Sequence, residues 1–415
     1  MPTPDSAKAK KKFALSWGHL RSSTTYKTAG LAVAALVIFF AGVGVGNGSI
    51  FLHGVSNDAN KNLPNTLDYG TVTQVYNLLK THYDGKLDAT KLLDGMKIGL
   101  ASATGDPYTQ YFSKDEAQKF NEELSGSFTG IGAELSLDAD GNLIVQTPIK
   151  GFPAEKAGLR AQDIIVSIDG TTTSGMSVDK AVSLIRGPKD TKVALRILRD
   201  KKADLTFTIT RDQITVPSVN WQMLDGGVGY IAVTQFNEDT TNLMNQAGRD
   251  LKDQGAKSIL LDLRGNPGGL LSAAVDMAKM WLPQGKTIVQ EKRGGTVTDS
   301  YTSDGGGLFN GMKTAVLIDA GSASAAEIVS GALRDNNVAT LFGVKSFGKG
   351  SVQQIQNLPD GTEIKITVAR WYRPNGQNID KKGISPDHEV KMTDDDYKQK
   401  LDPQKDAALS FLQNQ

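Results

Sequence analysis

The chain contains no cysteine among its 415 residues, which excludes structural disulfides, thiolate catalysis and cysteine-ligated zinc. Histidine is scarce as well, and no Gly-x-Ser-x-Gly string occurs anywhere. The four histidines, none within a recognisable motif, are His19, His53, His82 and His388. Their positions argue against a Ser-His-Asp triad. Net charge is also nearly absent, because 46 Lys and Arg offset 45 Asp and Glu, so we expect no nucleic-acid partner.

A long uncharged apolar run lies near the N-terminus. Residues 30–46 read GLAVAALVIFFAGVGVG, and with their neighbours the segment 29–52 is long enough to cross a bilayer. Six basic residues precede this segment and few follow it, so the positive-inside rule places residues 1–28 in the cytoplasm and the later residues outside. We therefore predict a single-pass anchor in the cell membrane. A cleaved signal peptide is the alternative, because GVGVGNGS offers small residues for cleavage.

The remaining length predicts two or three domains. After a polar linker come amphipathic helical patterns, then short β-like runs around one longer helix. A region that alternates strand and helix follows, which is typical of an α/β domain with a largely parallel sheet. The predicted segments are a linker at 53–66, a helical domain at 67–125, a β-rich module at 126–212, an α/β domain at 213–393 and a charged, partly helical tail at 394–415.

Two serines stand where a predicted strand passes into a predicted helix, in IDAGSASAAEIVSG at 318–331. Serine is a preferred helix N-cap and alanine the best helix former, so Ser322 and Ser324 can be no more than the start of a helix. Alternatively, one hydroxyl is a nucleophile at the positive end of the helix dipole. The motif alone leaves both interpretations open.

A lysine can replace histidine as the base if burial lowers its pKa. Of two Ser-x-x-Lys strings, the one at 177–180 opens a predicted helix, so Ser177 is expected to be an N-cap. The other, at 346–349, has Gly348 and Gly350 beside the lysine and is poor helical material. Lys349 nevertheless follows a predicted strand without a neighbouring carboxylate. A solvated loop lysine is the alternative interpretation.

Two small-residue loops could present backbone N–H groups. LLDLRGNPGGLL at 260–271 is a strand, a glycine-rich turn and a helix start, suited to a phosphate or an oxyanion. Because the dinucleotide and P-loop spacings are missing, we favour the oxyanion. FTGIGAEL at 128–135 could hold a carboxylate while an added strand pairs beside it, or it is only a strand with a tight entry turn.

In this order the motifs resemble the C-terminal processing, or tail-specific, serine peptidases, from about Leu67 to Val390. The stretches that carry the resemblance are GDPYTQYF, GIGAEL, AGLRAQDIIVSIDG, LIRGPKDTKV, LDLRGNPGGLL, GSASAAEIVSGALRD, FGKGSVQQ and GISPDHEV. The resemblance implies a multidomain α/β plus β protein. After the transmembrane helix it would have a helical lead-in, a PDZ-like domain at 126–212 and a peptidase core at 213–393.

The resemblance also implies a serine–lysine dyad with a supporting glutamine and no metal or other cofactor. The nucleophile falls on Ser324, the base 25 residues later on Lys349, and the glutamine four residues further on Gln353, which would orient the amine. The oxyanion donors would be the N–H of Ala325 and that of Gly268 or Gly269. One departure is visible, because Ala326 stands where the family often has a third serine outside the dyad.

The implied function is a membrane-anchored, extracytoplasmic serine endopeptidase that cleaves protein or peptide substrates near their C-termini. The PDZ-like module would bind the substrate tail, and Arg186 would couple that binding to the active state. The residues expected to contact the tail are Gly130, Ile131, Gly132, Ala133, Val182, Ile185 and Arg186. Two alternatives are a catalytically silent PDZ adaptor and a Ser-Lys β-lactam-binding enzyme; the latter needs a helical Ser-x-x-Lys and a KTG-like strand, which the chain lacks. The oligomeric state stays open, with a homodimer as one option.

Overall fold

The computed structural model describes residues 63–64, 66–200 and 203–414. The predicted cytoplasmic lead, the predicted transmembrane segment and most of the predicted linker lie outside these residues. Within the described part of the chain, no helix combines the length and apolar character needed to span a membrane. The chain forms two compact units: one takes the described residues up to Leu92 with Asn357–Thr362, and the other takes Leu93–Gln356 with Glu363 onward.

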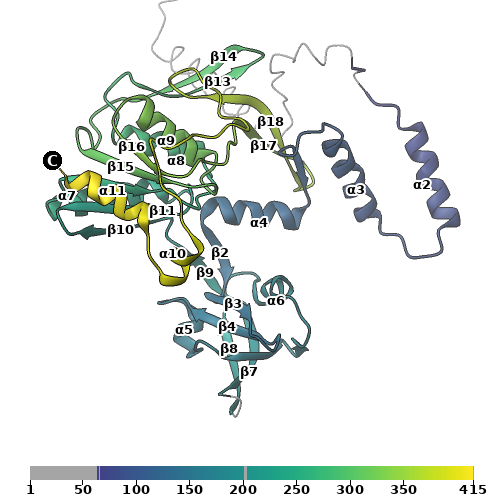
Figure 1. The fold of residues 1–415 in the computed structure, drawn as a ribbon. Coiled ribbons are helices and arrows are strands. Elements are labelled where there is room, and N and C mark those ends of the chain that lie inside the picture. The colour runs from purple at the N-terminus through teal and green to yellow at the C-terminus, as the bar shows by residue number, and fades with distance from the viewer. Residues whose placement is uncertain (1–62, 65, 201–202, 415) are drawn as a thin grey trace, which may run out of the picture. The chain divides into compact units, whose positions relative to one another are not determined.

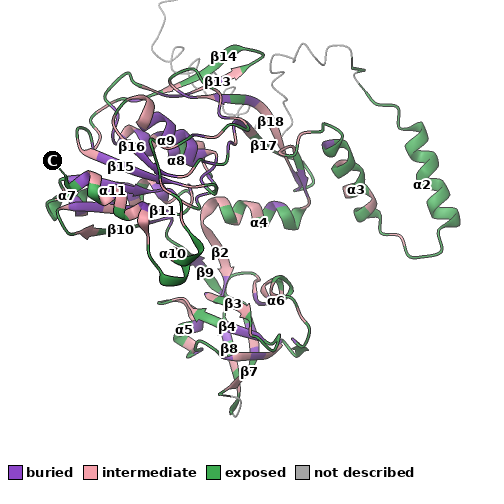
Figure 2. Ribbon diagram, viewed as in Figure 1, coloured by how far each residue is buried: buried purple, intermediate pink, exposed green. Residues whose placement is uncertain are grey.

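The helical lead-in predicted at 67–125 is present. Its helices are α2 (Gly70–His82), α3 (Ala89–Ser102) and α4 (Lys114–Ser125). Helix α4 begins with a capping box, because the Glu116 carboxylate accepts hydrogen bonds from the Ser113 N–H at 2.9 Å and from its hydroxyl at 2.7 Å. The apolar stripe of α2 is solvent-exposed, and no residue of that helix is buried (Figure 2).

The β-rich module is built around an antiparallel sheet with its own core. Its strand order is β3 (Ala133–Leu137), β4 (Leu143–Pro148), β5 (Ile164–Ile168), β7 (Lys192–Arg199) and β8 (Ala203–Thr210), with β6 (Thr171–Thr172) beside β5. The helices α5 (Pro153–Ala157) and α6 (Val178–Ile185) accompany the sheet. Ser177 is the N-cap of α6, as predicted, and accepts a hydrogen bond from the Lys180 N–H at 3.3 Å. A separate pair, β2 (Ser127–Gly130) with β9 (Asp212–Thr215), brings the chain into and out of this module.

The predicted α/β domain contains a six-stranded sheet. The order is β10 (Val219–Leu224), β11 (Val228–Val233), β12 (Ser258–Asp262), β15 (Lys313–Ile318), β16 (Thr340–Gly343) and β19 (His388–Glu389). Only the β10–β11 pair is antiparallel; the other pairings are parallel. The carboxyl ends of β12 and β15 therefore open at the same edge, where α/β proteins usually bind their ligands.

Both faces of this sheet are buried, which explains why its central strands are continuous apolar runs rather than alternating ones. On β12, Ile259 and Leu261 belong to one core with α7 (Thr240–Asp253), α8 (Leu271–Lys279) and α9 (Ala325–Asp335). Leu260, between them in sequence, belongs to the core on the opposite face, under α11 (Pro403–Gln413). Figure 1 shows this helix–sheet–helix arrangement.

A second, antiparallel sheet interrupts the predicted strand–helix alternation. It joins β1 (Gln110–Phe112), β18 (Glu363–Tyr372), β13 (Thr287–Arg293) and β14 (Thr296–Thr302), and β17 (Ser351–Asn357) pairs with β18. The run TIVQEKR lies within the segment 213–393, for which we predicted alternating strands and helices, but it forms β13 of this second sheet instead. Its hairpin partner β14 follows after only two residues, too short for a parallel crossover.

The C-terminal segment is more than a charged tail. The predicted helical character is confirmed in α10 (Asp394–Gln399) and α11, but Ala408 and Leu412 of α11 are buried against the sheet. The ammonium of Lys313 donates to the Phe411 carbonyl at 2.6 Å and so binds the C-terminal end of α11. This helix therefore completes one face of the domain that carries the site.

Candidate active site

Ser324 occupies a strained turn between β15 and α9. Its backbone has φ 53° and ψ −113°, a region that a residue with a Cβ atom seldom adopts. Such strain persists only where surrounding contacts enforce it, and it is concentrated at functional sites. Ser324 is partly exposed, whereas Ala323 and Ala325 on either side are buried. The turn therefore presents this one hydroxyl at the N-terminus of a buried helix.

Ser322 has the structural role that the sequence allowed for either serine. Its hydroxyl is buried, donates to the Leu263 carbonyl at 2.8 Å and accepts from the Asp319 N–H at 2.9 Å. The bond with Asp319 stabilises the turn after β15, and the bond with Leu263 attaches this turn to the loop after β12. The first of the two serines is therefore a turn residue.

The buried carboxylate of Glu327 holds the strained turn in place. It accepts hydrogen bonds from the Ser324 N–H at 2.9 Å, from the Ser346 hydroxyl at 2.6 Å, and from the N–H groups of Gly348 at 2.8 Å and Lys349 at 2.9 Å. A fully buried carboxylate requires such partners, because water no longer solvates it. One side chain thereby joins the start of α9 to the lysine loop. Our sequence reasoning missed Glu327, although an acid three residues after a candidate N-cap is a recognisable signal.

Lys349 lies in a glycine-bounded loop between β16 and β17. A Cβ atom at Gly350 would come within 2.3 Å of the Asp380 N–H nitrogen, and one at Gly348 within 2.8 Å of the Gly383 nitrogen. The loop can therefore pack this closely only with glycine at both positions. Lys349 is half-buried as a result, which excludes the solvated loop lysine.

Burial is the main reason why the pKa of Lys349 lies below the ordinary lysine value. The positive charge of Lys365 lowers the pKa further, while the Glu327 carboxylate opposes the shift. Within the described residues, Lys349 forms no ion pair, and the Tyr108 ring centroid lies 5.3 Å from its Nζ atom. These surroundings favour a neutral amine, which can accept a proton.

The glycine-rich turn after β12 packs directly against Ser324. A Cβ atom at Gly268 would lie 2.7 Å from the Ser324 Cβ atom and 3.1 Å from the Ala325 nitrogen, so only glycine fits there. The N–H of Gly268 donates to the Asn266 side chain at 2.9 Å. The N–H groups of Gly269 and Ala325 have no hydrogen-bond partner among the described residues. Two available donors thus lie on the two segments that pack together here, one directly after Ser324 and one directly after Gly268.

Gln353 is near the loop, on β17, but its amide is engaged elsewhere. Its Nε2 atom donates to the Ser351 hydroxyl at 2.6 Å and, at 3.4 Å, to the Thr367 hydroxyl. In the part of the chain that the structure describes, the Lys349 amine has no hydrogen-bond partner. The role of Gln353 in orienting this amine therefore stays a prediction.

Comparison with known proteins identifies the family. The family model of peptidase family S41 matches residues 227–390, and that of the PDZ domain matches residues 144–199. The carboxy-terminal processing protease CtpA of Bacillus subtilis (strain 168) is 37% identical over 355 residues, covering 83% of this chain and 74% of its own length. The chain belongs to the S41 C-terminal processing serine peptidases.

Other relatives of this S41 peptidase agree. A CtpA-like serine protease of Staphylococcus aureus (strain N315) is 38% identical over 317 residues, which span 76% of this chain and 63% of that protein. A crystal structure of a Bacteroides fragilis protein assigned to the S41 proteases matches with a TM-score of 0.52 and 18% identity. It covers 84% of this chain and 98% of its own, and at that identity it supports the fold alone.

In this S41 peptidase, a buried charge network anchors the glycine-rich turn. The guanidinium of Arg264 donates to the Asp262 carboxylate at 2.7 Å and to that of Asp402, in the C-terminal segment, at 2.8 Å. The Tyr230 hydroxyl donates to Asp262 at 2.9 Å, and burial raises the pKa of this tyrosine. Sequence reasoning missed the network, although charged residues at the end of an apolar strand are a visible signal.

The PDZ residues predicted to contact a tail lie at one end of the module. The N–H groups of Ile131 and Gly132 have no partner among the described residues, and Gly132 has a φ of 73°. Consecutive N–H groups with one left-handed residue can form an anion-binding nest. On α6, Val182 is partly exposed, whereas Ile185 is buried in the PDZ core. Of the two, only Val182 presents surface to a ligand.

Arg186 ends α6 and turns away from the PDZ core. Its guanidinium donates to the Glu122 carboxylate of α4 at 3.1 Å and lies 4.3 Å from the ring centroid of Phe128 on β2. Arg186 therefore connects the helix beside the predicted groove to the helix that precedes the PDZ module.

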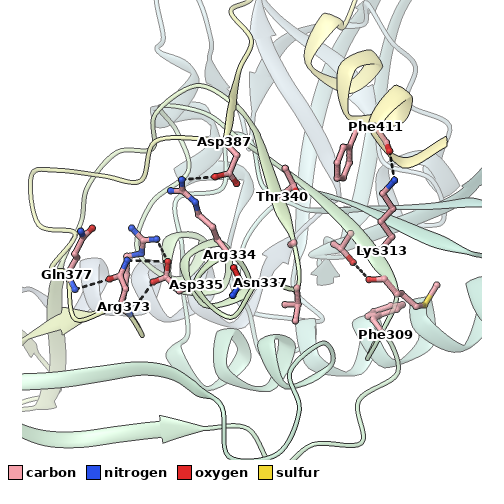
Figure 3. A pocket seen from close by; sticks show the side chains of 16 residues that line it. Phe309, Lys313, Arg334, Asp335, Asn337, Thr340, Arg373, Gln377, Asp387 and Phe411 are labelled. Carbon is pink, nitrogen blue, oxygen red and sulfur yellow. Dashed lines mark hydrogen bonds and ion pairs between the residues drawn. The ribbon is translucent and has the colours of Figure 1, made fainter. Parts of the chain in front are cut away.

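A polar cavity of about 940 Å³ lies away from these residues. It is lined from the first residues of β15 and β16 and the last turn of α9, at the edge of the sheet opposite Ser324. Its charged side chains are largely paired, Arg334 with Asp387 and Arg373 with Asp335 (Figure 3). None of the predicted site residues lines it.

Replacing Glu327 tests whether this carboxylate holds the site together. Glu327→Gln would turn an amide N–H₂ toward donors that need an acceptor. We expect peptidase activity to fall about 100-fold as the turn shifts and the free energy of unfolding to fall by about 3 kcal/mol. Turnover and urea unfolding measure the two effects. Glu389→Gln, at an exposed ion pair with Lys391, is the control, expected within about 0.5 kcal/mol of the wild type. A destabilised variant with full turnover would limit Glu327 to a structural role.

Proposed function

We propose that this S41 peptidase is a membrane-anchored, extracytoplasmic endopeptidase that cleaves proteins near their C-termini with Ser324 as nucleophile and Lys349 as base. One observation carries the assignment. The buried carboxylate of Glu327 accepts hydrogen bonds both from the strained Ser324 and from the loop that carries Lys349. The pKa of this lysine is lowered. A catalytically silent adaptor would need neither the strain nor the depressed pKa, both of which cost free energy.

The chemistry follows from these positions. The neutral amine of Lys349 takes the proton from the Ser324 hydroxyl as its oxygen attacks the scissile carbonyl carbon. The N–H groups of Ala325 and Gly269 would bind the resulting oxyanion. The Lys349 ammonium then gives its proton to the leaving amine, which departs with the C-terminal fragment. Water, deprotonated by the same lysine, hydrolyses the acyl-enzyme and restores Ser324.

Gly269 is the better choice for the second donor. The N–H of Gly268 is already bound to Asn266, whereas the N–H of Gly269 has no partner among the described residues. Gly268 instead provides the close packing against Ser324. In this proposal Gly269 is the oxyanion donor and Gly268 the packing residue, a choice that the sequence left open.

Substitution of the dyad tests the mechanism. Ser324→Ala and Lys349→Arg should both fold and lose activity by about 10⁴-fold or more, because Arg stays protonated and cannot act as a base. Hydrolysis of a protein substrate measures this, and an active-site serine acylator should label the wild type but not Ser324→Ala. Lys345→Arg, at an exposed lysine in the same loop, is the matched control. Normal turnover in Lys349→Arg beside an inactive Ser324→Ala would assign the base to another residue.

The PDZ module supports a choice of substrate by its C-terminus. We propose that the N–H groups of Ile131 and Gly132 bind the terminal carboxylate, and that Val182 contacts the last side chain. Hydrogen bonds to a charged acceptor are worth about 1.5–3 kcal/mol each, so this contact can dominate tail affinity.

A substrate with an amidated C-terminus tests tail recognition. Its kcat/KM should be about one tenth of the value for the free acid, or smaller, because the amide lacks the charge that the loop binds. Paired peptides of otherwise identical sequence make the comparison. Equal kcat/KM values for the two peptides would show that the module does not select tails.

The same pair of peptides tests whether Arg186 transmits tail binding. We propose that its contacts with Glu122 and Phe128 couple the PDZ groove to the peptidase domain. Arg186→Ala should then lower kcat for the free-acid peptide while the amidated peptide is little affected. Unchanged kinetics with both would remove the proposal.

We propose the membrane anchor on the apolar segment 29–52 and the basic residues before it, which lie outside the described residues. Protease added to intact cells that produce the full chain should then digest the PDZ and peptidase domains while residues 1–28 stay protected. Antibodies against each part would follow the digestion. A fully soluble exported form that starts near residue 47 would identify a cleaved signal peptide instead.

A further inference from the structure

The ring of Tyr108 covers the amine of Lys349. Its centroid lies 5.3 Å from the Nζ atom. Tyr108 belongs to the loop between α3 and β1, in the stretch GDPYTQYF, one of those that carry the family resemblance. It lies more than 200 residues before Ser324 and Lys349 in sequence and has no assigned role in the dyad.

The loop that carries Tyr108 is fixed from two sides. The Asp106 carboxylate accepts from the Tyr108 N–H at 3.2 Å and from the Thr109 hydroxyl at 2.7 Å. The Thr109 hydroxyl oxygen in turn accepts from the Thr367 N–H on β18 at 3.2 Å. Immediately afterwards, β1 pairs with β18, the strand that also carries Lys365. The ring is therefore held over Lys349 by the second sheet.

The groups that face Lys349 come from three elements. Lys365 from β18 repels a charged amine, Glu327 from α9 attracts it, and the Tyr108 ring contributes surface without formal charge. Because loss of water is the largest cause of the lowered pKa of Lys349, whatever covers the amine matters most. An aromatic face also attracts a cation, but that attraction is smaller than the hydration lost on burial.

The phenol group adds no countercharge. Burial, followed by the nearby carboxylates of Asp380, Asp106 and Glu327, raises the pKa of Tyr108, although Arg370 opposes the shift. Tyr108 therefore stays neutral at the pH where Lys349 must lose its proton. Its hydroxyl has no hydrogen-bond partner among the described residues. The ring, rather than the hydroxyl, is thus the part that acts on Lys349.

We propose that Tyr108 is a positioning residue whose ring excludes water from Lys349 and so keeps the amine unprotonated for the reaction. The proposal rests on the role of Lys349 as base. It gives the loop before β1 a function in catalysis: a displacement of this loop would admit water to the amine and favour its protonated, inactive form.

Three substitutions separate the ring from the hydroxyl and from folding. Tyr108→Ala removes the ring, Tyr108→Phe keeps it, and Tyr108→Leu replaces it with apolar bulk that has no aromatic face. Tyr372→Ala is the matched control, because Tyr372 lies on β18, the strand that holds the Tyr108 loop, and its ring, like that of Tyr108, lies under a lysine, with its centroid 4.4 Å from the Nζ atom of Lys292.

The pKa of Lys349 is measured by NMR titration of the full chain labelled at lysine Cε, with its signal assigned by comparison with Lys349→Arg. We expect Tyr108→Ala to raise this pKa by about one unit. Tyr108→Phe should keep the wild-type value, Tyr108→Leu should stay closer to the wild type than Ala does, and Tyr372→Ala should not change it.

An unchanged or lowered pKa in Tyr108→Ala would overturn the proposal, and a lowered one would mean that the ring stabilises the ammonium instead. If Tyr108→Ala does not fold, Tyr108→Leu decides. A pKa of Lys349 at or below the wild-type value in this variant supports water exclusion, and a pKa raised by a unit or more overturns it.

The pH dependence of kcat/KM separates this proposal from the assignment of the base. Activity needs the neutral amine, so it is lost as the pH falls through the pKa of Lys349. A raised pKa must therefore move the acidic limb of the profile to higher pH by the same amount. If the NMR pKa rises in Tyr108→Ala and the acidic limb does not move, water exclusion by Tyr108 is supported and Lys349 is not the base.

Discussion

The site depends on one buried carboxylate that must find hydrogen-bond donors. Glu327 lies in the first turn of α9, where water cannot solvate it, and four N–H and O–H groups from the Ser324 turn and the lysine loop bind it. Leaving any of them unpaired would cost free energy, so the two loops are held in a single arrangement. The strained backbone of Ser324 can persist because this network, more than the local chain, determines it.

The same network resolves a conflict around Lys349. A carboxylate near a lysine normally stabilises the ammonium, whereas the proposed role of Lys349 as base needs a neutral amine. Glu327 binds the backbone N–H of Lys349 instead of its amine, and its remaining hydrogen bonds go to Ser324, Ser346 and Gly348. Burial and the positive charge of Lys365 then outweigh the carboxylate and lower the pKa. A charged group thus shapes the loop while the pKa of its lysine still lies below the ordinary value.

Packing beyond the site explains why these loops meet at all. The parallel sheet is covered on one face by α7, α8 and α9 and on the other by the C-terminal helix α11, so its strand ends are fixed in space. Arg264 ties the turn after β12 to Asp402 of the C-terminal segment. The antiparallel sheet adds the loop with Tyr108, through the pairing of β1 with β18. Each part of the chain that approaches the site is therefore anchored to a different layer.

Much of the molecule follows from sequence alone. The spacing of hydrophobic residues and the glycine-rich turns predicted the helical lead-in, the β-rich module and the α/β domain. The order of the motifs along the chain indicated Ser324, Lys349 and the turn at 265–269. These signals are local, because a motif and its spacing are contained within a few residues. Tertiary structure alone decided which N–H beside Ser324 is available, where the Gln353 amide points and what covers Lys349. What covers Lys349 depends on partners outside its own loop, Glu327 for the loop and Tyr108 for the amine, and no local pattern encodes contact between residues that only folding brings together. The other two depend on side-chain conformations near the residue itself, such as that of Asn266, which accepts from the Gly268 N–H two residues on, and residue type alone does not determine them.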